Sequence, residues 1–280
     1  MAPPSAPDGA RVRALTAADL LPLSYAEARA FRTDATMNWF GNVQSIIPAS
    51  PAQGSKAAYC WESLRLFMWG LTGATFYHPD GVADVVVRPP TEEEAQDGGR
   101  KGLGVDMSSV VSVKEGKEKL CACAMWLPAD KEIDGWWLSL RSGWWRSWFR
   151  WDRVGHQRMN NQYTPACHKV FVREFEQRGL KLANALYLLN INVDPVDQGK
   201  GYTTLLMNAA FERWPGAPMI LEASSEKSRD VYAHFGFEIV ETIAFSKGEV
   251  TSKGIPPVDG EEAEGMTLWF MVNGQVVTDK

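Results

Sequence analysis

A glycine-containing turn at residues 193–204 is the part of the sequence best suited to binding chemistry. It reads Val-Asp-Pro-Val-Asp-Gln-Gly-Lys-Gly-Tyr-Thr-Thr and joins an expected strand to an expected helix. The first amides of a helix lack partners within the helix and carry the positive end of its dipole, so they bind anions. Gly199 and Gly201 leave the main chain accessible to phosphate oxygens because they have no side chains. The turn therefore predicts a diphosphate site built from backbone N–H groups.

Spacing separates this turn from two other phosphate-binding motifs. A P-loop requires a glycine five positions before Gly199, where this sequence has Asp194. A dinucleotide-binding fingerprint requires a glycine at position 204, where the sequence has Thr204. Both of these nucleotide-binding classes are therefore excluded.

A third phosphate-binding motif fits the turn. The run Gln198-Gly199-Lys200-Gly201 resembles the Q/R-x-x-G-x-G/A signature of the GNAT superfamily of N-acetyltransferases. The preceding run Asn-Val-Asp-Pro at 192–195 resembles the end of that superfamily's fourth strand. The later run Tyr-Ala-His-Phe-Gly-Phe-Glu at 232–238 resembles its Tyr-x-x-x-Gly-Phe-Glu helix. The resemblance covers residues 184–240, and the long segment 128–182 is similar to the elaborations of the longer fungal members.

This resemblance implies that acetyl-CoA is the co-substrate and that a primary amine attacks its thioester directly, through a tetrahedral intermediate. Tyr232 is the implied general acid for the departing thiolate, and Glu222 is our candidate for the general base. Asn190 is the candidate for substrate binding. The residues expected to bind the cofactor are Ile191, Asn192, Val193, Gln198, Gly199, Lys200, Gly201, Tyr202, Thr203, Thr204 and Ser225.

Two positions depart from the superfamily pattern. Thr203 replaces a preferred glycine or alanine, and Ser225 replaces an asparagine that touches the cofactor in many relatives. These departures keep a second class of function open, a non-catalytic acyl-CoA-binding regulatory protein.

Other roles are also open for the candidate side chains. Tyr232 has the alternative of packing beside its neighbours, and Glu222 that of a hydrogen-bonded carboxylate at a strand end. Asn190 and Asn192 either line the substrate cleft or satisfy irregular backbone nearby. The acceptor, a small-molecule or peptide amine, is left unassigned.

The elements that must position these residues predict an α/β (α+β) fold with a mixed, mostly antiparallel sheet of about six to seven strands flanked by helices. Apolar and β-branched runs place strands at 10–15, 81–88, 109–113, 119–127, 184–193, 219–223, 237–245 and 266–272. Helical spacing and capping residues place helices at 20–31, 56–70, 168–178, 201–214 and 226–235. Residues 91–104 are expected to be an exposed loop. We expect a disordered start at 1–9 and one domain at 10–280, with a helical insertion at about 128–183.

A tryptophan-rich segment at 136–151 holds six of the 12 tryptophans, interleaved with arginines. Trp and Arg suit boundaries between apolar and wet regions, so one interpretation is a membrane-surface or ligand-gripping helix. The favoured interpretation is an insertion that packs its aromatic side chains onto the core and leaves the arginines outside.

The composition limits the partners. A formal charge of −5 over 280 residues argues against a nucleic-acid-binding surface spread over the protein. Cys121 and Cys123 match neither a zinc nor a redox spacing, and the four histidines show no ligand spacing, so we expect buried thiols and no metal. Without a recognisable secretory signal or a long apolar run, a cytoplasmic location is expected. The oligomeric state is left open.

Overall fold

One sheet organises the part of the chain that the structure, a computed structural model, describes: residues 7–96, 110–113, 116–133 and 135–274. Its strand order is β1-β2-β4-β5-β6-β8-β7, and β3 pairs with β4 outside this path. The strands are β1 (Arg11–Ala14), β2 (Val82–Arg88), β3 (Val110–Val113), β4 (Gly116–Pro128), β5 (Leu186–Val193), β6 (Met219–Ala223), β7 (Glu238–Phe245) and β8 (Met266–Asn273). Neighbours are antiparallel except β5 and β6, which are parallel. The mixed, mostly antiparallel sheet is therefore confirmed.

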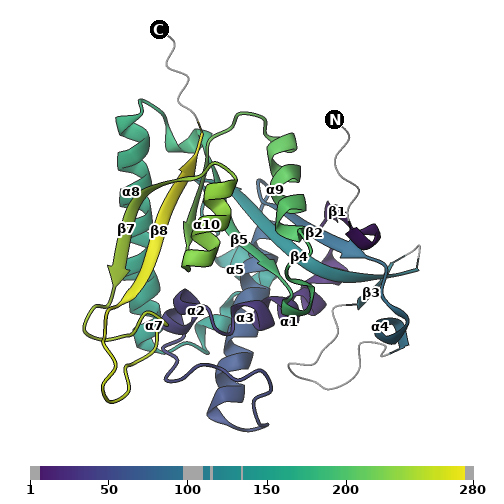
Figure 1. Cartoon of the computed structure of the whole chain (residues 1–280), viewed down its shortest axis with the longest axis horizontal. Helices are drawn as coiled ribbons and strands as arrows, with labels where there is room; N and C mark the ends of the chain where they lie inside the picture. Colours follow the sequence, from purple (N-terminus) through teal and green to yellow (C-terminus); the bar gives the residue numbers. More distant parts are fainter. Residues whose placement is uncertain (1–6, 97–109, 114–115, 134, 275–280) are drawn as a thin grey trace.

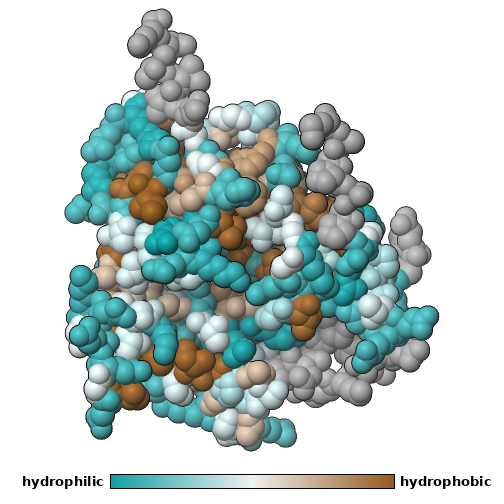
Figure 2. Space-filling view, viewed as in Figure 1, coloured by the Kyte–Doolittle hydropathy of each residue, from teal (hydrophilic) through white to brown (hydrophobic). Residues whose placement is uncertain are grey.

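Helices cover both faces of the sheet (Figure 1). One face, which we call the α1 face, carries α1 (Leu20–Phe31), α2 (Ala35–Phe40), α3 (Lys56–Tyr77) and α8 (Thr164–Gln177). The other, the α9 face, carries α9 (Tyr202–Arg213) and α10 (Glu226–His234). Each face has its own cluster of buried apolar side chains. Viewed from the α9 side, the molecular surface is mainly hydrophilic with separate apolar patches (Figure 2).

Strand β5 contains an irregularity at the centre of the sheet. Asn190 pairs with Met125 of β4 and Leu188 pairs with the next residue, Trp126, so Leu189 is an extra residue in the ladder. Such a bulge bends the strand that carries it. The parallel pairing of β5 with β6 stops just before it, at Tyr187 and Ile220. The two central strands are therefore unpaired along the rest of their length.

Helix α3 is longer than its sequence pattern predicted, because it continues past Gly70 to Tyr77. A Cβ at Gly70 would lie 2.8 Å from the Trp144 ring, and one at Gly73 would lie 2.9 Å from the Ser142 carbonyl oxygen. These glycines therefore do not end the helix. They allow the tryptophan-rich segment to approach its surface.

The expected exposed loop at 91–104 is wrong in its first part, where α4 (Glu92–Gln96) forms a short helix. The Thr91 amide donates to the Glu94 carboxylate (2.8 Å) and the Glu94 amide donates to the Thr91 hydroxyl (3.3 Å). This reciprocal capping was present in the sequence as Thr-x-x-Glu. The remainder, 97–104, lies outside the described residues.

The tryptophan-rich segment forms the short helices α5 (Trp136–Ser142) and α6 (Trp145–Trp148), and the helix α7 (Arg153–Gln157) follows it. Trp144 and Trp151 pack on Phe67, with ring centroids 5.0 and 4.3 Å away. The favoured interpretation is wrong for the other four tryptophans, because Trp136, Trp137, Trp145 and Trp148 are all exposed. Only part of the segment therefore serves as core.

Candidate active site

The glycine turn forms an open cradle between β5 and α9. A 3-10 turn, η5 (Pro195–Asp197), follows β5, and Gly199 and Gly201 then adopt φ values of 80° and 79°. Only glycine takes up such conformations without strain. No described atom lies within 4 Å of a Cβ built at either glycine. Space for a ligand is therefore directly above the main chain.

Backbone donors point into this space. Helix α9 begins after Gly201, and no described residue accepts a hydrogen bond from the amides of Tyr202, Thr203 or Thr204. With the helix dipole behind them, these amides suit the paired phosphates of a CoA molecule. The geometry therefore fits the predicted cofactor.

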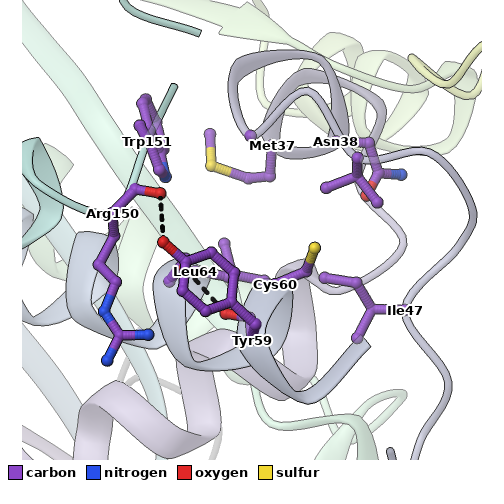
Figure 3. Close-up of a pocket in the computed structure, with 11 residues that line it drawn as sticks. Met37, Asn38, Ile47, Tyr59, Cys60, Leu64, Arg150 and Trp151 are labelled. Atoms are coloured by element: carbon purple, nitrogen blue, oxygen red, sulfur yellow. Dashed lines mark hydrogen bonds between the residues drawn. The ribbon is translucent and has the colours of Figure 1, made fainter. Parts of the chain in front are cut away.

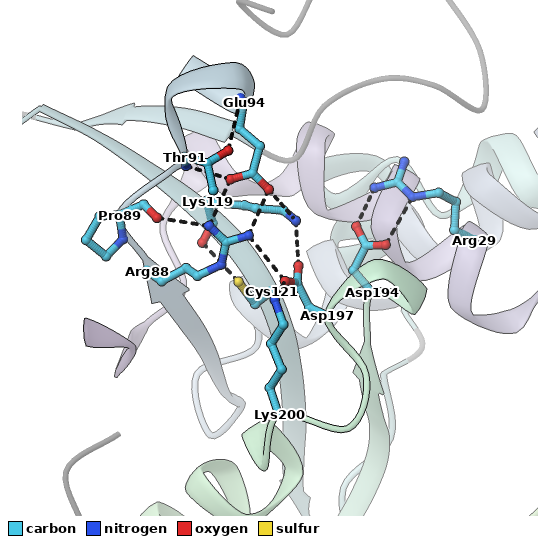
Figure 4. Close-up of polar contacts among 10 residues, drawn as sticks. All are labelled: Arg29, Arg88, Pro89, Thr91, Glu94, Lys119, Cys121, Asp194, Asp197 and Lys200. Atoms are coloured by element: carbon cyan, nitrogen blue, oxygen red, sulfur yellow. Dashed lines mark hydrogen bonds and ion pairs between the residues drawn. The ribbon is translucent and has the colours of Figure 1, made fainter. Parts of the chain in front are cut away.

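A buried carboxylate, Asp197, anchors the turn that leads into the cradle (Figure 4). It accepts hydrogen bonds from Lys119 (2.6 Å), Lys200 (2.8 Å) and Arg88 (3.3 Å). Burial by itself would raise the pKa of Asp197, but the hydrogen bonds from Lys119 and Lys200 outweigh it and the pKa is lowered. Asp197 is therefore held ionised. The Lys200 amine is directed at this carboxylate, so its backbone amide is the donor left for a ligand in the cradle.

The same anchor reaches two further elements. Glu94 of α4 accepts from Arg88 (2.7 Å) and lies 2.9 Å from the Lys119 amine. Its hydrogen bond from Arg88 holds the pKa of Glu94 well below its usual range. Separately, Arg29 of α1 binds Asp194, with nitrogen and oxygen 2.6 Å apart. Ion pairs thus connect the cradle's leading turn to β2, β4, α4 and α1.

A second group of polar residues lies on the α1 face, around Glu222 of β6. The Glu222 carboxylate accepts from the hydroxyls of Tyr187 (2.7 Å) and Tyr163 (3.3 Å), and these hydroxyls are 3.1 Å apart. Burial raises the pKa of Glu222 to about 7, although the hydrogen bonds from Tyr187 and Tyr163 oppose the rise. Its Oε1 atom has no partner among the described residues. Glu222 can therefore exchange a proton near neutral pH.

Tyr163 reaches this group from an unusual helical turn. Residues Arg158–Tyr163 (η3) form a π-helix between α7 and α8. Such turns are rare and frequently occur at functional sites. Since the sequence gives no signal for a π-helix, Tyr163 was not among the predicted site residues.

Tyr232 of α10 is buried in the core of the α9 face. Burial, with added repulsion from the charges of Asp34 and Glu222, raises the pKa of Tyr232 above its usual range. Its hydroxyl forms no hydrogen bond with a described residue. The side chain therefore stays protonated, with its proton available to a ligand.

Asp34 is a candidate site residue that sequence reasoning did not single out. Its carboxylate caps α2 by accepting from the Met37 amide (3.0 Å), and it also accepts from the Ser224 hydroxyl (2.5 Å) at the end of β6. Burial raises the pKa of Asp34. An aspartate before a helix signals a cap, but its link to β6, 190 positions away, is tertiary.

Glu27 of α1 is a second missed residue. It is fully buried and accepts from the Thr72 hydroxyl (2.8 Å) and from the amide groups of Asn190 (3.4 Å) and Asn192 (3.3 Å). Burial raises the pKa of Glu27 to about 8. Both asparagine side chains therefore point towards α1 and donate to a carboxyl group, not to the irregular backbone that one of the two alternatives named. Substrate binding by Asn190 stays a prediction, and contact between Asn192 and the cofactor would have to use its main chain.

Two predicted cofactor contacts have other roles in the structure. The Tyr202 ring is buried in the α9-face core, and its hydroxyl has no partner among the described residues. The Ser225 hydroxyl caps α10 by accepting from the Ser228 amide (3.1 Å). Cofactor binding by either residue stays a prediction, and for Tyr202 only its amide is available.

A small cavity lies between α2, α3 and the tryptophan-rich segment (Figure 3). It encloses about 30 Å³, and the Tyr59 hydroxyl closes one side by donating to the Arg150 carbonyl oxygen (3.1 Å). Trp151, which lines it, contacts Phe40, and Phe40 contacts Tyr163. Aromatic rings therefore separate this cavity from the group around Glu222.

Comparison with known proteins gives two curated fungal relatives. An uncharacterized N-acetyltransferase of Schizosaccharomyces pombe is 29% identical over 126 residues, which are 44% of this chain and 50% of that protein. Increased recombination centers protein 11 of Saccharomyces cerevisiae is 43% identical over 54 residues, which are 19% of this chain and 33% of that protein. The chain thus matches half or less of the length of these relatives. No protein-family model matches the sequence.

Among solved structures, one described as arylalkylamine N-acetyltransferase 7 of the mosquito Aedes aegypti has the same fold. The match covers 94% of this chain and 86% of that one, with a TM-score of 0.53 and 12% identity. The shared fold and the stretch of fungal sequence agree with the ordered motifs around the cradle. The predicted resemblance of this chain to the GNAT superfamily of N-acetyltransferases, and to its fungal members, is confirmed.

Proposed function

We propose that the chain is an N-acetyltransferase that moves an acetyl group from acetyl-CoA to a primary amine by direct attack. One observation carries the proposal. The open turn at Gly199 and Gly201, with free amides at the start of α9, follows the part of β5 that is no longer paired with β6. Such an arrangement suits a cofactor whose diphosphate sits on the turn and whose arm runs between the two strands.

The main chain does most of the binding in this proposal. The amides of residues 198–204 hold the diphosphate, and the backbone of residues 191–193, beyond the last β5–β6 pair, holds the arm. When bound, acetyl-CoA supplies an electrophilic thioester carbon. Fixing that carbon beside the amine removes much of the entropic cost of the reaction.

Glu222 is the proposed general base. An alkyl amine is protonated at pH 7, so it must lose a proton before its nitrogen can attack. The carboxylate has a pKa of about 7 and a free Oε1 atom, so it accepts that proton directly or through one water. The hydroxyls of Tyr187 and Tyr163 hold its other oxygen in place.

Tyr232 is the proposed general acid for the leaving thiolate. Its pKa lies above the usual tyrosine value because the side chain is buried. A thiolate released into the same surroundings is also more basic than in water, since burial disfavours the charged form. The carboxylates of Asp34 and Glu222 nearby favour a cationic acceptor, a small-molecule or peptide amine. The four unpaired cysteines support a reducing compartment such as the cytoplasm.

Two measurements test the proposal. Calorimetry should detect binding of CoA, and release of free thiol from acetyl-CoA should depend on an added amine from a panel of alkyl, aryl and peptide amines. Tyr232→Phe should retain CoA binding and lose most of the thiol release. A protein that binds CoA but releases no thiol with any amine would instead be a regulatory acyl-CoA-binding protein, and one that binds no CoA would overturn the proposal.

A further inference from the structure

A set of six large apolar side chains is exposed on the tryptophan-rich segment. We call it the Trp surface, and it consists of Trp136, Trp137, Leu140, Trp145, Trp148 and Phe149. Trp136, Trp137 and Phe149 are 75, 61 and 78% exposed. Helices this short cannot bury both sides of an aromatic-rich sequence, and α3 takes up only Trp144 and Trp151. Large exposed apolar patches mark surfaces that contact something else.

The charge of this region is opposite to that of the whole protein. Residues 135–151 contain three arginines and neither Asp nor Glu, while the chain carries −5. Arg141 lies over the Tyr77 ring (4.6 Å), Arg146 over Trp69 (5.3 Å) and Arg150 over Tyr59 (4.9 Å). Among the described residues no carboxylate pairs with any of the three. Their charges are therefore directed at solvent or at an external anion.

A groove of about 310 Å³ combines apolar walls with positive charge. Aromatic and aliphatic side chains of α1, α3, α5 and α6 form its walls, and Arg141 and Arg146 lie among them. The guanidinium group binds phosphate through two parallel hydrogen bonds. The groove therefore suits a phosphate attached to an apolar body, and the exposed tryptophans beside it suit the boundary between headgroups and acyl chains.

We infer that the Trp surface docks onto membranes that contain anionic phospholipids, with Arg141 and Arg146 binding headgroup phosphates. Charge complementarity selects this partner over a second copy, since two copies would bring like charges together. No described helix has the length and apolar character needed to cross a bilayer. Contact is therefore at the membrane surface. The inference is independent of the proposed acetyl transfer, because the segment packs on α3, across the sheet from the cradle.

Vesicle sedimentation of the full chain tests this inference. Vesicles of phosphatidylcholine alone are compared with vesicles in which phosphatidylserine makes up about a third of the lipid. We expect at least ~10-fold stronger binding to the anionic vesicles, and a loss of that preference in high salt. Arg141→Gln and Arg146→Gln should each weaken binding about fivefold.

The aromatic contribution is tested by the double variant Trp136→Ser and Trp137→Ser. It should weaken vesicle binding by ~10-fold or more, because about two large side chains lose their insertion. Val258→Ser, at a side chain that is 67% exposed in the loop between β7 and β8, is the matched control and should bind as the wild type does. Thermal unfolding and thiol release in solution should be unchanged in every variant.

Other results would overturn the inference. Equal binding to both kinds of vesicle would show that the arginines do not bind anionic headgroups. Absence of binding to either kind would show that the Trp surface does not dock onto membranes. Concentration-dependent dimers that disappear in the double tryptophan variant would assign the surface to a second copy. Binding of free inorganic phosphate with the same affinity as anionic vesicles would assign the groove to a soluble anion.

Discussion

The two sides of strand β5 offer different kinds of binding group. On the α9 face the cradle uses main-chain amides and two glycines, and its opening is exposed. On the α1 face the polar groups are buried side chains, with Glu27 and Glu222 held by hydroxyl and amide donors. Main-chain sites need only a short local motif, whereas side-chain sites need several distant elements. This difference explains why the sequence predicts the cofactor more readily than the acceptor.

Glu222→Gln should have the largest effect, and it tests the proposed role of the α1 face in catalysis. Removing the base should reduce kcat/KM by ~10³-fold, since general-base catalysis contributes on this scale. CoA affinity should stay within about twofold of wild type if the two sides act separately. Steady-state kinetics and calorimetry measure these effects. Glu238→Gln, an exposed carboxylate of β7, is the control. Loss of CoA binding in Glu222→Gln would show that the two sides are not independent.

Gly201→Val tests the proposed role of the α9 face in binding CoA. A β-branched residue is strained at the φ of 79°, and its side chain fills the space above the amides. We expect CoA affinity to fall by ~10²-fold, the size of losing about two charge-assisted hydrogen bonds. Gly216→Val, at a φ of 75° with equally open surroundings, matches the strain without touching the cradle. Equal loss of CoA binding in both variants would count against a diphosphate site at Gly201.

Glu27→Gln tests whether the buried carboxyl group on the α1 face changes the pH dependence of the unfolding free energy. The folded-state pKa of about 8 lies above the ordinary value of 4.5, so Glu27 supports folding most below pH 4.5. That contribution is lost as pH rises to about 8. Between pH 6 and 9 the wild type should therefore lose on the order of 2 kcal/mol more unfolding free energy than Glu27→Gln.

Denaturant unfolding at both pH values measures this difference. Glu212→Gln, an exposed carboxylate of α9, should behave as the wild type does. Identical pH dependence in wild type and Glu27→Gln would mean that Glu27 does not retain its proton in the folded protein.

Tyr187→Phe should give the smallest effect, and it tests whether the Tyr187 hydroxyl sets the pKa of Glu222. The Tyr187 hydroxyl stabilises ionised Glu222, so its loss should raise the Glu222 pKa and move the inflection of kcat/KM above 7. The shift should be about one pH unit, the size of one hydrogen bond to a charged group. Tyr163→Phe should shift the profile less, because its bond is longer, 3.3 against 2.7 Å. A profile unchanged by Tyr187→Phe would point to another base.

The fold was largely predictable, because apolar runs and terminating residues are local. Strand β6 and helix α1 have the predicted bounds, and Gly236, with a φ of 85°, follows α10 as expected. The α1-face site was not predictable in the same way. Glu27 is 163 positions from Asn190, and Asp34 is 190 positions from Ser224, so only the folded chain brings them together. Tyr163 depends on a π-helix, for which sequence patterns carry no signal.

The inserted residue Leu189 has a consequence for how a ligand is received. Because the bulge belongs to the ladder with β4, the width of the opening towards β6 is set by the protein alone, before any ligand arrives. A receptor built in this way spends little binding free energy on rearrangement. Deleting Leu189 would straighten β5 and allow it to form further hydrogen bonds with β6, its parallel neighbour. The chain would then retain every residue of the glycine motif and still lose the opening between β5 and β6 that the proposed function assigns to the cofactor's arm.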